Sequence, residues 1–371
     1  MKFIALLTVF VFSVSTVFAQ ISDAIEEFAL PDELNESSGI IFFNNKLLTH
    51  NDSGGENKLY ELDVNSGLVT RTVTVLNTTN VDWEDLTQDD SYIYIGDFGN
   101  YAGDRTDLKI YKISKTDYLN STNVTAEIIS FNYAAQTSFT NNENNTEWDA
   151  ESLISFNTEN LILFSRNWIN GNTRAYLIPK TAGNYGLNPL PSTLNSGGLT
   201  SGATYNSESK KLFLIGYTQF LQPFVWESEN FTGIDVFSGT NTQTSLSANF
   251  GFEQIEGITG NGNGKYFITS ETFNNSGISD YGKFISFSEE NTLSINNDGV
   301  EELQLFPNPV NTILSIKTNN FQKVEIFNTK GALLHLGNSK TLNMQAFNSG
   351  IYFVKITQNN NSSSIKKIIK K

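Results

Sequence analysis

The chain has 371 residues, a length at which one hydrophobic core usually divides into more than one domain. Hydrophobic residues make up 39%, which excludes general disorder, and the abundance of Asn, Ser, Thr, Gly and aromatic residues favours strands and turns over helices. The net charge is −15. There is no cysteine and there are two histidines, so disulfides and thiolate metal sites are excluded and a multi-histidine zinc site is not expected.

Residues 1–19 predict a secretory signal peptide. Lys2 precedes a long apolar run, and Val17-Phe18-Ala19 forms a plausible cleavage position. The mature chain is expected to begin at Gln20. A membrane anchor is the alternative for this segment. No later apolar stretch approaches the ~20 residues that span a bilayer, so no transmembrane segment is predicted.

Charge divides the rest of the chain. Residues 303–371 hold nine Lys and one acidic residue, a net charge of +8, whereas residues 20–302 hold 14 basic and 38 acidic residues, a net charge of −24. Because phosphate backbones and anionic lipids repel such a body, nucleic acid is not an expected partner. The expected partners are instead cations, neutral glycans or a metal-bridged anion.

Short motifs recur along residues 20–290. DWEDL (82–86), DAESL (149–153) and EQIEGI (253–258) share an acidic pattern, and ESSGI (36–40) and TSGA (200–203) are related to them. The copies are spaced by 46, 67, 50 and 55 residues, which is typical of propeller blades. Their anchor positions are Gly39, Asp85, Ser152, Gly202 and Gly257.

An apolar strand follows each anchor, as in YIYIGDF and LILFSRN, and in most copies a third strand comes next. Each repeat therefore predicts a meander of three or four strands, and neighbouring meanders can bury each other radially. We expect an all-β chain whose residues 20–290 form a five-bladed β-propeller. Six blades are the alternative, with one hidden in the 67-residue interval. The segment 24–31 is expected to supply the outer strand of the last blade.

The first strand of each blade in a propeller lines the central channel, so the acidic motifs are expected to meet at one mouth. Carboxylates crowded in this way repel each other unless they are protonated or bind a cation. Oxygen ligands without His or Cys favour calcium or magnesium, and calcium is the expected cofactor. The alternative is that these acids cap loops and hold the blades in register. The predicted metal ligands are Glu84, Glu151, Glu256, Asp82 and Asp149, with Glu36 and Glu253 near them.

A polar residue lies 12 to 15 positions after each anchor, on the strand that follows, and should also face this mouth. We predict that these residues contact an extracellular ligand, which the sequence does not identify. They are Asp52, Asp97, Arg166 and Glu271, with Tyr217 at the equivalent position of the fourth repeat.

The opening ELNESSGIIFFNNKLLTHNDSG, followed by KLYELD, resembles the SdiA-regulated periplasmic propellers and the esterase-like phytase family. The resemblance covers most of residues 25–290 and implies a propeller and, in some relatives, bound calcium. The fourth repeat departs from the pattern, because Ser201-Gly202 stands where other copies have an acid.

Two functions remain open from the sequence, so whether the chain is an enzyme is not decided. The first is a binding or scaffold module. The second is a metal-dependent hydrolase of a phosphoester, ester or glycan, in which Glu84 or Glu151 would act as general base. A Ser–His–Asp triad in the body would need His50, which we interpret as a hydrogen-bonding surface residue.

Residues 291–302 are interpreted as a linker, and residues 303–371 predict a small antiparallel β-sandwich. This tail closely resembles the C-terminal sorting domain of type IX secretion cargo from Bacteroidota, through LFPNP (305–309), VEIFN (324–328) and SGIYFVK (349–355). The residues that carry the sorting pattern are Pro307, Asn308, Pro309, Gly331, Gly350, Lys366 and Lys367. The resemblance implies that the partner is the type IX secretion machinery and that the protein is secreted or held on the outer cell surface.

Overall fold

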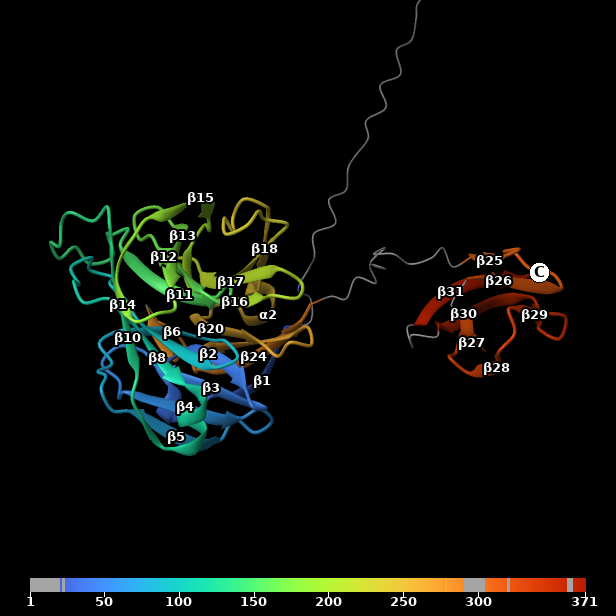
Figure 1. Ribbon diagram of the computed structural model, residues 1–371, viewed down its shortest axis with the longest axis horizontal. Coiled ribbons are helices and arrows are strands. Elements are labelled where there is room, and N and C mark those ends of the chain that lie inside the picture. Colours follow the sequence, from blue (N-terminus) through green and yellow to red (C-terminus); the bar gives the residue numbers. More distant parts are fainter. Residues whose placement is uncertain (1–20, 22–23, 276, 290–303, 319–320, 359–362) are drawn as a thin grey trace, which may run out of the picture. The chain divides into compact units, whose positions relative to one another are not determined.

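The computed structural model describes residue 21 and residues 24–275, 277–289, 304–318, 321–358 and 363–371 (Figure 1). The predicted signal peptide (1–19) and the predicted linker (291–302) lie outside these residues. Contacts divide the chain into two compact units, residues 1–291 and 292–371. Each unit is described by itself below.

The first unit contains five sheets, each built outward from one central strand. The central strands are β2 (Ser37–Phe43), β6 (Trp83–Gln88), β11 (Asp149–Ser155), β16 (Leu199–Asn206) and β20 (Ile255–Gly260). The second strands are β3 (Lys46–Asn51), β7 (Tyr92–Asp97), β12 (Asn160–Arg166), β17 (Lys211–Tyr217) and β21 (Lys265–Ser270). The third strands are β4 (Lys58–Asp63), β8 (Lys109–Ser114), β13 (Asn172–Pro179), β18 (Pro223–Glu229) and β24 (Lys283–Ser288). The outer strands are β5 (Val69–Val75), β10 (Glu127–Tyr133), β15 (Pro189–Asn195), β19 (Thr240–Ser245) and β1 (Ile25–Ala29).

The five central strands contact one another in a cycle. β2 contacts β6 and β20, β6 contacts β11, and β11 and β20 both contact β16, and the five labels gather near the centre of this unit in Figure 1. Five hydrophobic clusters fill the spaces between the sheets, and each cluster draws its side chains from two neighbouring sheets. This is a propeller-like arrangement.

The pattern of burial explains the strand sequences. The second strands are covered on both faces by neighbouring sheets, so β17 reads as the apolar run KLFLIGY, and six of its seven residues are buried. The outer strand β5 reads VTRTVTV and alternates, because only one of its faces is covered.

The N-terminal segment completes the last sheet, as its sequence predicts. β1 pairs antiparallel with β24, so the sheet that begins with β20 takes its outer strand from the start of the described chain. The 67-residue interval between Asp85 and Ser152 contains no sixth sheet among its residues, all of which the structure describes. It holds α1 (Lys115–Asn120), β9 (Asn123–Val124) and β10. β9 adds to β5 in parallel, and β14 (Gly183–Leu187) adds to β10 in parallel.

Each repeat motif forms an irregularity of register at the start of a central strand. In β11 the pairing skips Glu151, in β16 it skips Ser201, and in β20 it skips Glu256. In β6 the pairing skips both Glu84 and Asp85, and β2 shows a shift at the same place. A β-bulge leaves the extra residue outside the ladder and redirects its side chain. The recurring motif is therefore the sequence of a bulge.

The bulges allow neighbouring central strands to approach closely. Ser38 Oγ donates to the carbonyl oxygen of Glu84 at 2.5 Å, and Ser201 Oγ donates to that of Ile255 at 2.5 Å. A Cβ at Gly257 would overlap the carbonyl oxygen of Ser38, so only glycine fits at this anchor.

The remaining elements of the first unit are short. They are the 3-10 helix η1 (Asp32–Leu34), the helix α2 (Ser247–Phe250), and the hairpin β22 (Phe273–Asn275) and β23 (Ile278–Asp280).

The second unit has two antiparallel sheets, which agrees with the small β-sandwich that the sequence predicts. One sheet has the order β25-β26-β29 and the other β28-β27-β30-β31, and eleven buried residues form one core. The strands are β25 (Gln304–Phe306), β26 (Ile313–Lys317), β27 (Phe321–Phe327), β28 (Leu333–Gly337), β29 (Thr341–Asn343), β30 (Gly350–Gln358) and β31 (Ser363–Lys370).

Candidate metal centre at the acidic mouth

Three carboxylates from two neighbouring sheets meet at the start of the central strands. One carboxylate oxygen from each of Asp52, Asp82 and Glu84 lies within 4.8 Å of the other two. Asp52 follows β3, Asp82 precedes β6, and Glu84 is an extra residue of the β6 bulge. The sequence predicts Asp82 and Glu84 as metal ligands and Asp52 as a ligand contact, and the structure brings these residues together.

The negative charges of these three carboxyl groups are destabilised by burial and by neighbouring carboxylates. Burial, and then the charges of Asp82 and Glu256, hold the pKa of Asp52 well above its usual range. Burial, and then the charge of Asp149, raise the pKa of Asp82 to about 6. Burial, and then the charge of Asp52, hold the pKa of Glu84 well above its usual range. A proton or a bound cation stabilises carboxyl groups in such surroundings.

Two further observations mark this position as able to take an ion. The buried Oδ1 atom of Asp52 has no hydrogen-bond partner among the described residues. A Cβ at Gly99 would overlap the carboxylates of Glu84 and Asp82, so glycine at this position leaves room for both side chains. Oxygen donors of this kind, partly open to solvent, suit a hard divalent cation such as calcium.

Glu151 and Glu256, the other two bulge glutamates, lie on either side of Arg166. Nη1 of Arg166 is 3.2 Å from Oε1 of Glu151, and Nη2 is 3.5 Å from Oε2 of Glu256. The Nε atom of Arg166 donates to the carbonyl oxygen of Thr200 at 2.9 Å. All three charged side chains are less than 8% exposed. The predicted ligand contact Arg166 is thus a buried ion-pairing residue that joins three sheets.

One hydrogen bond and one electrostatic interaction link these acids to their neighbours. The hydroxyl group of Tyr217 donates to Oε1 of Glu256 at 3.0 Å. Burial, and then the charges of Asp52 and Glu151, hold the pKa of Glu84 well above its usual range, so the carboxyl groups of Glu84 and Glu151 lie near each other. The candidate metal centre and the Arg166 ion pairs therefore adjoin through this carboxyl pair.

Asp149 and Asp97 are engaged by protein groups instead. Oδ1 of Asp149 accepts from the backbone of Asn100 at 2.5 Å and of Ala150 at 3.1 Å, and its Oδ2 accepts from the indole of Trp168 at 2.7 Å. Asp97 is fully buried and forms an ion pair with Arg105 at 2.8 Å. The carboxyl groups of both residues are thus engaged in bonds within the protein, which is the structural role that the sequence leaves open as the alternative.

Three other acids from the repeat motifs lie outside the trio of Asp52, Asp82 and Glu84. Oε2 of Glu271 accepts from the Gln254 side chain at 2.6 Å, and burial holds the pKa of Glu271 well above its usual range. Glu253 forms an ion pair with Lys283. Glu36 is exposed on the segment before β2, where Ser38 occupies the bulge.

His50 differs from its sequence-based interpretation as a surface residue. The side chain is fully buried, its ring packs edge-on against Trp83 with 5.5 Å between centroids, and burial lowers its pKa to about 4. It lies on β3, a second strand that neighbouring sheets cover on both faces, and this explains the burial.

In the second unit, Asn308 of the predicted sorting pattern holds β31. Its Nδ2 donates to the carbonyl oxygen of Lys367 at 3.1 Å, and its Oδ1 accepts from the backbone of Ile369 at 2.9 Å. Gly331 has a φ of 78° in the turn between β27 and β28, a conformation that favours glycine. Gly350 opens β30, and Lys366 pairs with Val354 across β30 and β31.

Residues 304–371 match the family model of the secretion system C-terminal sorting domain. A domain of this kind addresses its protein to the type IX secretion machinery, so the chain carries a signal for export to the cell surface or beyond. No curated protein matches the chain. Among the described residues, no helix is long and apolar enough to cross a membrane.

The chain is also similar to several solved structures, at low identity. A chain of the mitotic checkpoint complex is 10% identical and covers 78% of this chain and 98% of its own length, with a TM-score of 0.37. Two proteins of Bacteroides thetaiotaomicron follow. The extracellular domain of a hybrid two-component system is 12% identical over 88% of this chain and 48% of its own, with a TM-score of 0.31. A quinoprotein alcohol dehydrogenase-like protein is 10% identical over 91% of this chain and 64% of its own, with a TM-score of 0.32. At these scores the similarity carries no conclusion about what this chain does.

Proposed function

We propose that residues 20–290 form a five-bladed β-propeller that acts outside the cell as a calcium-dependent binding module. The ion would be held at the acidic mouth by Asp52, Asp82 and Glu84. The observation that carries the proposal is the meeting of three carboxylate oxygens within 4.8 Å of one another, where no Lys or Arg of the described residues forms an ion pair with any of the three.

The exposure of the trio suits binding better than a closed structural ion. Asp52 and Asp82 are partly exposed, whereas Glu84 is buried. Calcium takes six to eight oxygen ligands. Three carboxylates therefore leave positions for water or for an oxygen atom of a ligand, and a bound ion would turn a region that repels anions into one that accepts them.

Thermal unfolding of the chain from Gln20, with calcium and then with a chelator, tests the proposal. Calcium should raise the midpoint of the wild type and leave that of the Asp82→Asn/Glu84→Gln variant unchanged. Glu36→Gln is a matched control, because it removes an exposed acid near the mouth and should keep the response to calcium. A wild-type midpoint that neither calcium nor chelator moves would refute the ion site.

A metal-dependent hydrolase is a second candidate, favoured by two buried carboxyl groups, Glu84 and Glu151, whose pKa values burial raises beside the proposed ion. A carboxyl group with a raised pKa can donate a proton to a leaving group. The measurement is hydrolysis of p-nitrophenyl phosphate and p-nitrophenyl acetate with calcium present. Turnover that Glu151→Gln abolishes while calcium binding persists would support this function. Calcium binding without turnover would contradict the hydrolase and would be consistent with the binding module.

A further inference from the structure

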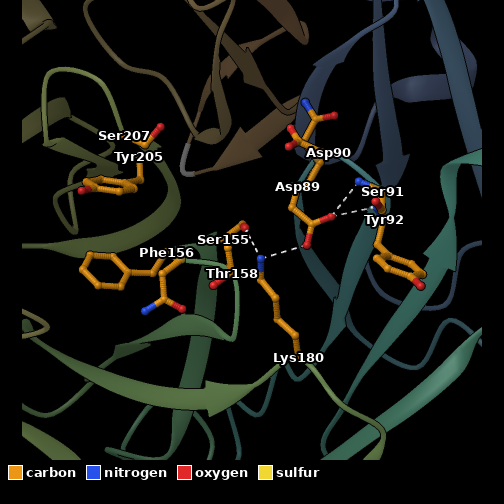
Figure 2. Close-up of a pocket in the computed structure, with 12 residues that line it drawn as sticks. Asp89, Asp90, Ser91, Tyr92, Ser155, Phe156, Thr158, Lys180, Tyr205 and Ser207 are labelled. Carbon is orange, nitrogen blue, oxygen red and sulfur yellow. Dashed lines mark hydrogen bonds and ion pairs between the residues drawn. The ribbon is translucent and has the colours of Figure 1, made fainter.

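A hollow opens at the ends of the central strands that lie opposite the acidic mouth. It is formed by three hairpin turns, 89–92 after β6, 155–158 after β11 and 205–207 after β16, together with Lys180 after β13 (Figure 2). Glu84 lies at the start of β6 and Asp89 lies just beyond its end. Asp89 comes five positions after Glu84, which is roughly 17 Å at the rise of an extended chain. The hollow is therefore a different place from the acidic mouth.

The size of the hollow suits a ligand. Its volume is about 550 Å³, within the range of roughly 300–1,000 Å³ that small-molecule sites occupy. A smaller cavity of about 130 Å³, lined by all five central strands, shares Gln88, Ser155 and Tyr205 with it. The hollow thus lies over the end of the central channel, where several sheets can contribute contacts.

A fixed polar group forms one part of the lining. Nζ of Lys180 donates to Oδ2 of Asp89 at 2.8 Å and to Oγ of Ser155 at 2.7 Å, as Figure 2 shows. Asp89 is itself held by the hydroxyl group of Tyr94 at 2.7 Å and by the backbone of Ser91 and Tyr92. An ammonium group carries three N–H donors, so a third can be offered to a ligand from a rigid position.

An aromatic surface faces this polar group. The rings of Phe156 and Tyr205 lie 5.2 Å apart with 32° between their planes, and Phe231 packs on Tyr205 at 6.3 Å. Phe156 and Tyr205 are both partly exposed, and Figure 2 shows them across the hollow from Tyr92. Rigid rings at the side of a hollow supply a flat apolar contact surface.

The charge of the lining limits the ligand. Asp89 and Asp90 outnumber the single cation Lys180, so a phosphate or carboxylate group would be repelled. A pyranose ring has an apolar C–H face that packs on an aromatic ring, and hydroxyl groups at its edge that exchange hydrogen bonds with Lys180 and Ser155. It meets both halves of the lining without adding charge.

We propose that this hollow is a binding site for a neutral oligosaccharide, with one sugar ring packed on Tyr205 and Phe156 and a hydroxyl group bound by Lys180. The site does not depend on the ion proposed at the mouth. Its failure and the failure of the calcium site can therefore be told apart.

The test is isothermal titration calorimetry of the chain from Gln20 with maltohexaose, cellohexaose, mannohexaose and xylohexaose, and with an oligogalacturonate as the anionic probe. At least one neutral hexasaccharide should bind saturably, more tightly than the anionic probe, and equally well with a chelator present. Tyr205→Ala should weaken that binding at least tenfold, and Tyr205→Phe, which keeps the ring, should restore it.

Two further variants keep the test independent of folding. Ser207→Arg places a bulky side chain at an exposed position of the rim and should abolish binding without disturbing the packed rings. Phe220→Ala removes an aromatic side chain that is 75% exposed and lies outside the hollow, so it should leave binding unchanged. Absence of binding to all four neutral probes would overturn the proposal. So would binding that survives both Tyr205→Ala and Ser207→Arg, or binding that the chelator removes.

Discussion

Nη1 of Arg166 lies 3.2 Å from Oε1 of Glu151, and both side chains are buried. The same guanidinium group lies 3.5 Å from Glu256, so one cation from β12 compensates two glutamates that come from the bulges of β11 and β20. Taking three charges out of water is costly, and their mutual attraction offsets this cost only while all of them are present. Arg166 is therefore placed to stabilise the contact between these sheets, whereas Asp52, Asp82 and Glu84 would be compensated by the proposed ion.

Replacement of Arg166 by methionine should destabilise the fold by about 3–5 kcal/mol, because it leaves Glu151 and Glu256 buried without a partner. Chemical denaturation at pH 7 measures the loss. The triple variant Arg166→Met/Glu151→Gln/Glu256→Gln removes the unpaired charges and should recover most of the stability. If Arg166→Met alone is as stable as the wild type, the ion pairs contribute nothing to the stability of the fold.

Asp85 should stabilise the contact between central strands. Its Oδ2 accepts from the backbone of Leu153 on β11 at 2.8 Å, and its Oδ1 accepts from that of Leu86 at 2.7 Å. Asp85→Ala leaves two buried N–H groups without this acceptor and should cost about 1–3 kcal/mol for each. Denaturant midpoints measure it, and Asp90→Ala, at an exposed position, is the control. Equal midpoints for the two variants would contradict the assignment.

The contribution of Asp82 to stability should depend on pH. Its pKa of about 6 in the folded, metal-free chain is above the usual value of about 3.8, so the folded chain binds more protons between these values. Stability from this group is therefore largest in acid and falls as the pH rises through 6. Asp82→Asn should gain stability relative to the wild type as the pH rises from about 3 to 7, by a total of about 1.4 kcal/mol for each unit by which the pKa is raised.

The difference between variant and wild type is the quantity to measure, because His50 acts in the opposite sense. Its pKa of about 4 is below the usual 6.5, so its contribution is lost as the pH falls through this range. Saturating calcium should remove the dependence on Asp82, since the ion replaces the proton. A difference that stays constant from pH 5 to pH 7 would mean that Asp82 titrates normally.

The repeats predict the start of each central strand because the same local feature recurs there. The anchors Gly39, Asp85, Ser152, Gly202 and Gly257 all lie at register shifts. The bulge is encoded locally, by a small or acidic residue before an aliphatic one, so the motif could be read without knowledge of the fold. Asp82 and Glu84 lie two positions apart within one motif, and the structure places both near Asp52 of the preceding repeat.

The partners of the acids could not be predicted in this way. Asp97 meets Arg105 from the loop after β7, and Asp149 meets the indole of Trp168 from the loop after β12. The conformations of these loops depend on tertiary packing rather than on a repeating pattern. The hollow lined by Lys180 and Tyr205 could not be predicted from the sequence for a related reason. Phe156 and Lys180 follow the ends of β11 and β13, and Tyr205 lies near the end of β16, so no single stretch of sequence contains the hollow.

Direct calcium titration by isothermal titration calorimetry, on metal-stripped chain starting at Gln20, tests the account most directly. The account predicts a single site with a dissociation constant at or below about 1 mM, the weak end of extracellular calcium modules. That site should be lost in Asp82→Asn/Glu84→Gln and retained in Glu36→Gln. Absence of a site in the wild type, or an unchanged site in the double variant, would contradict it.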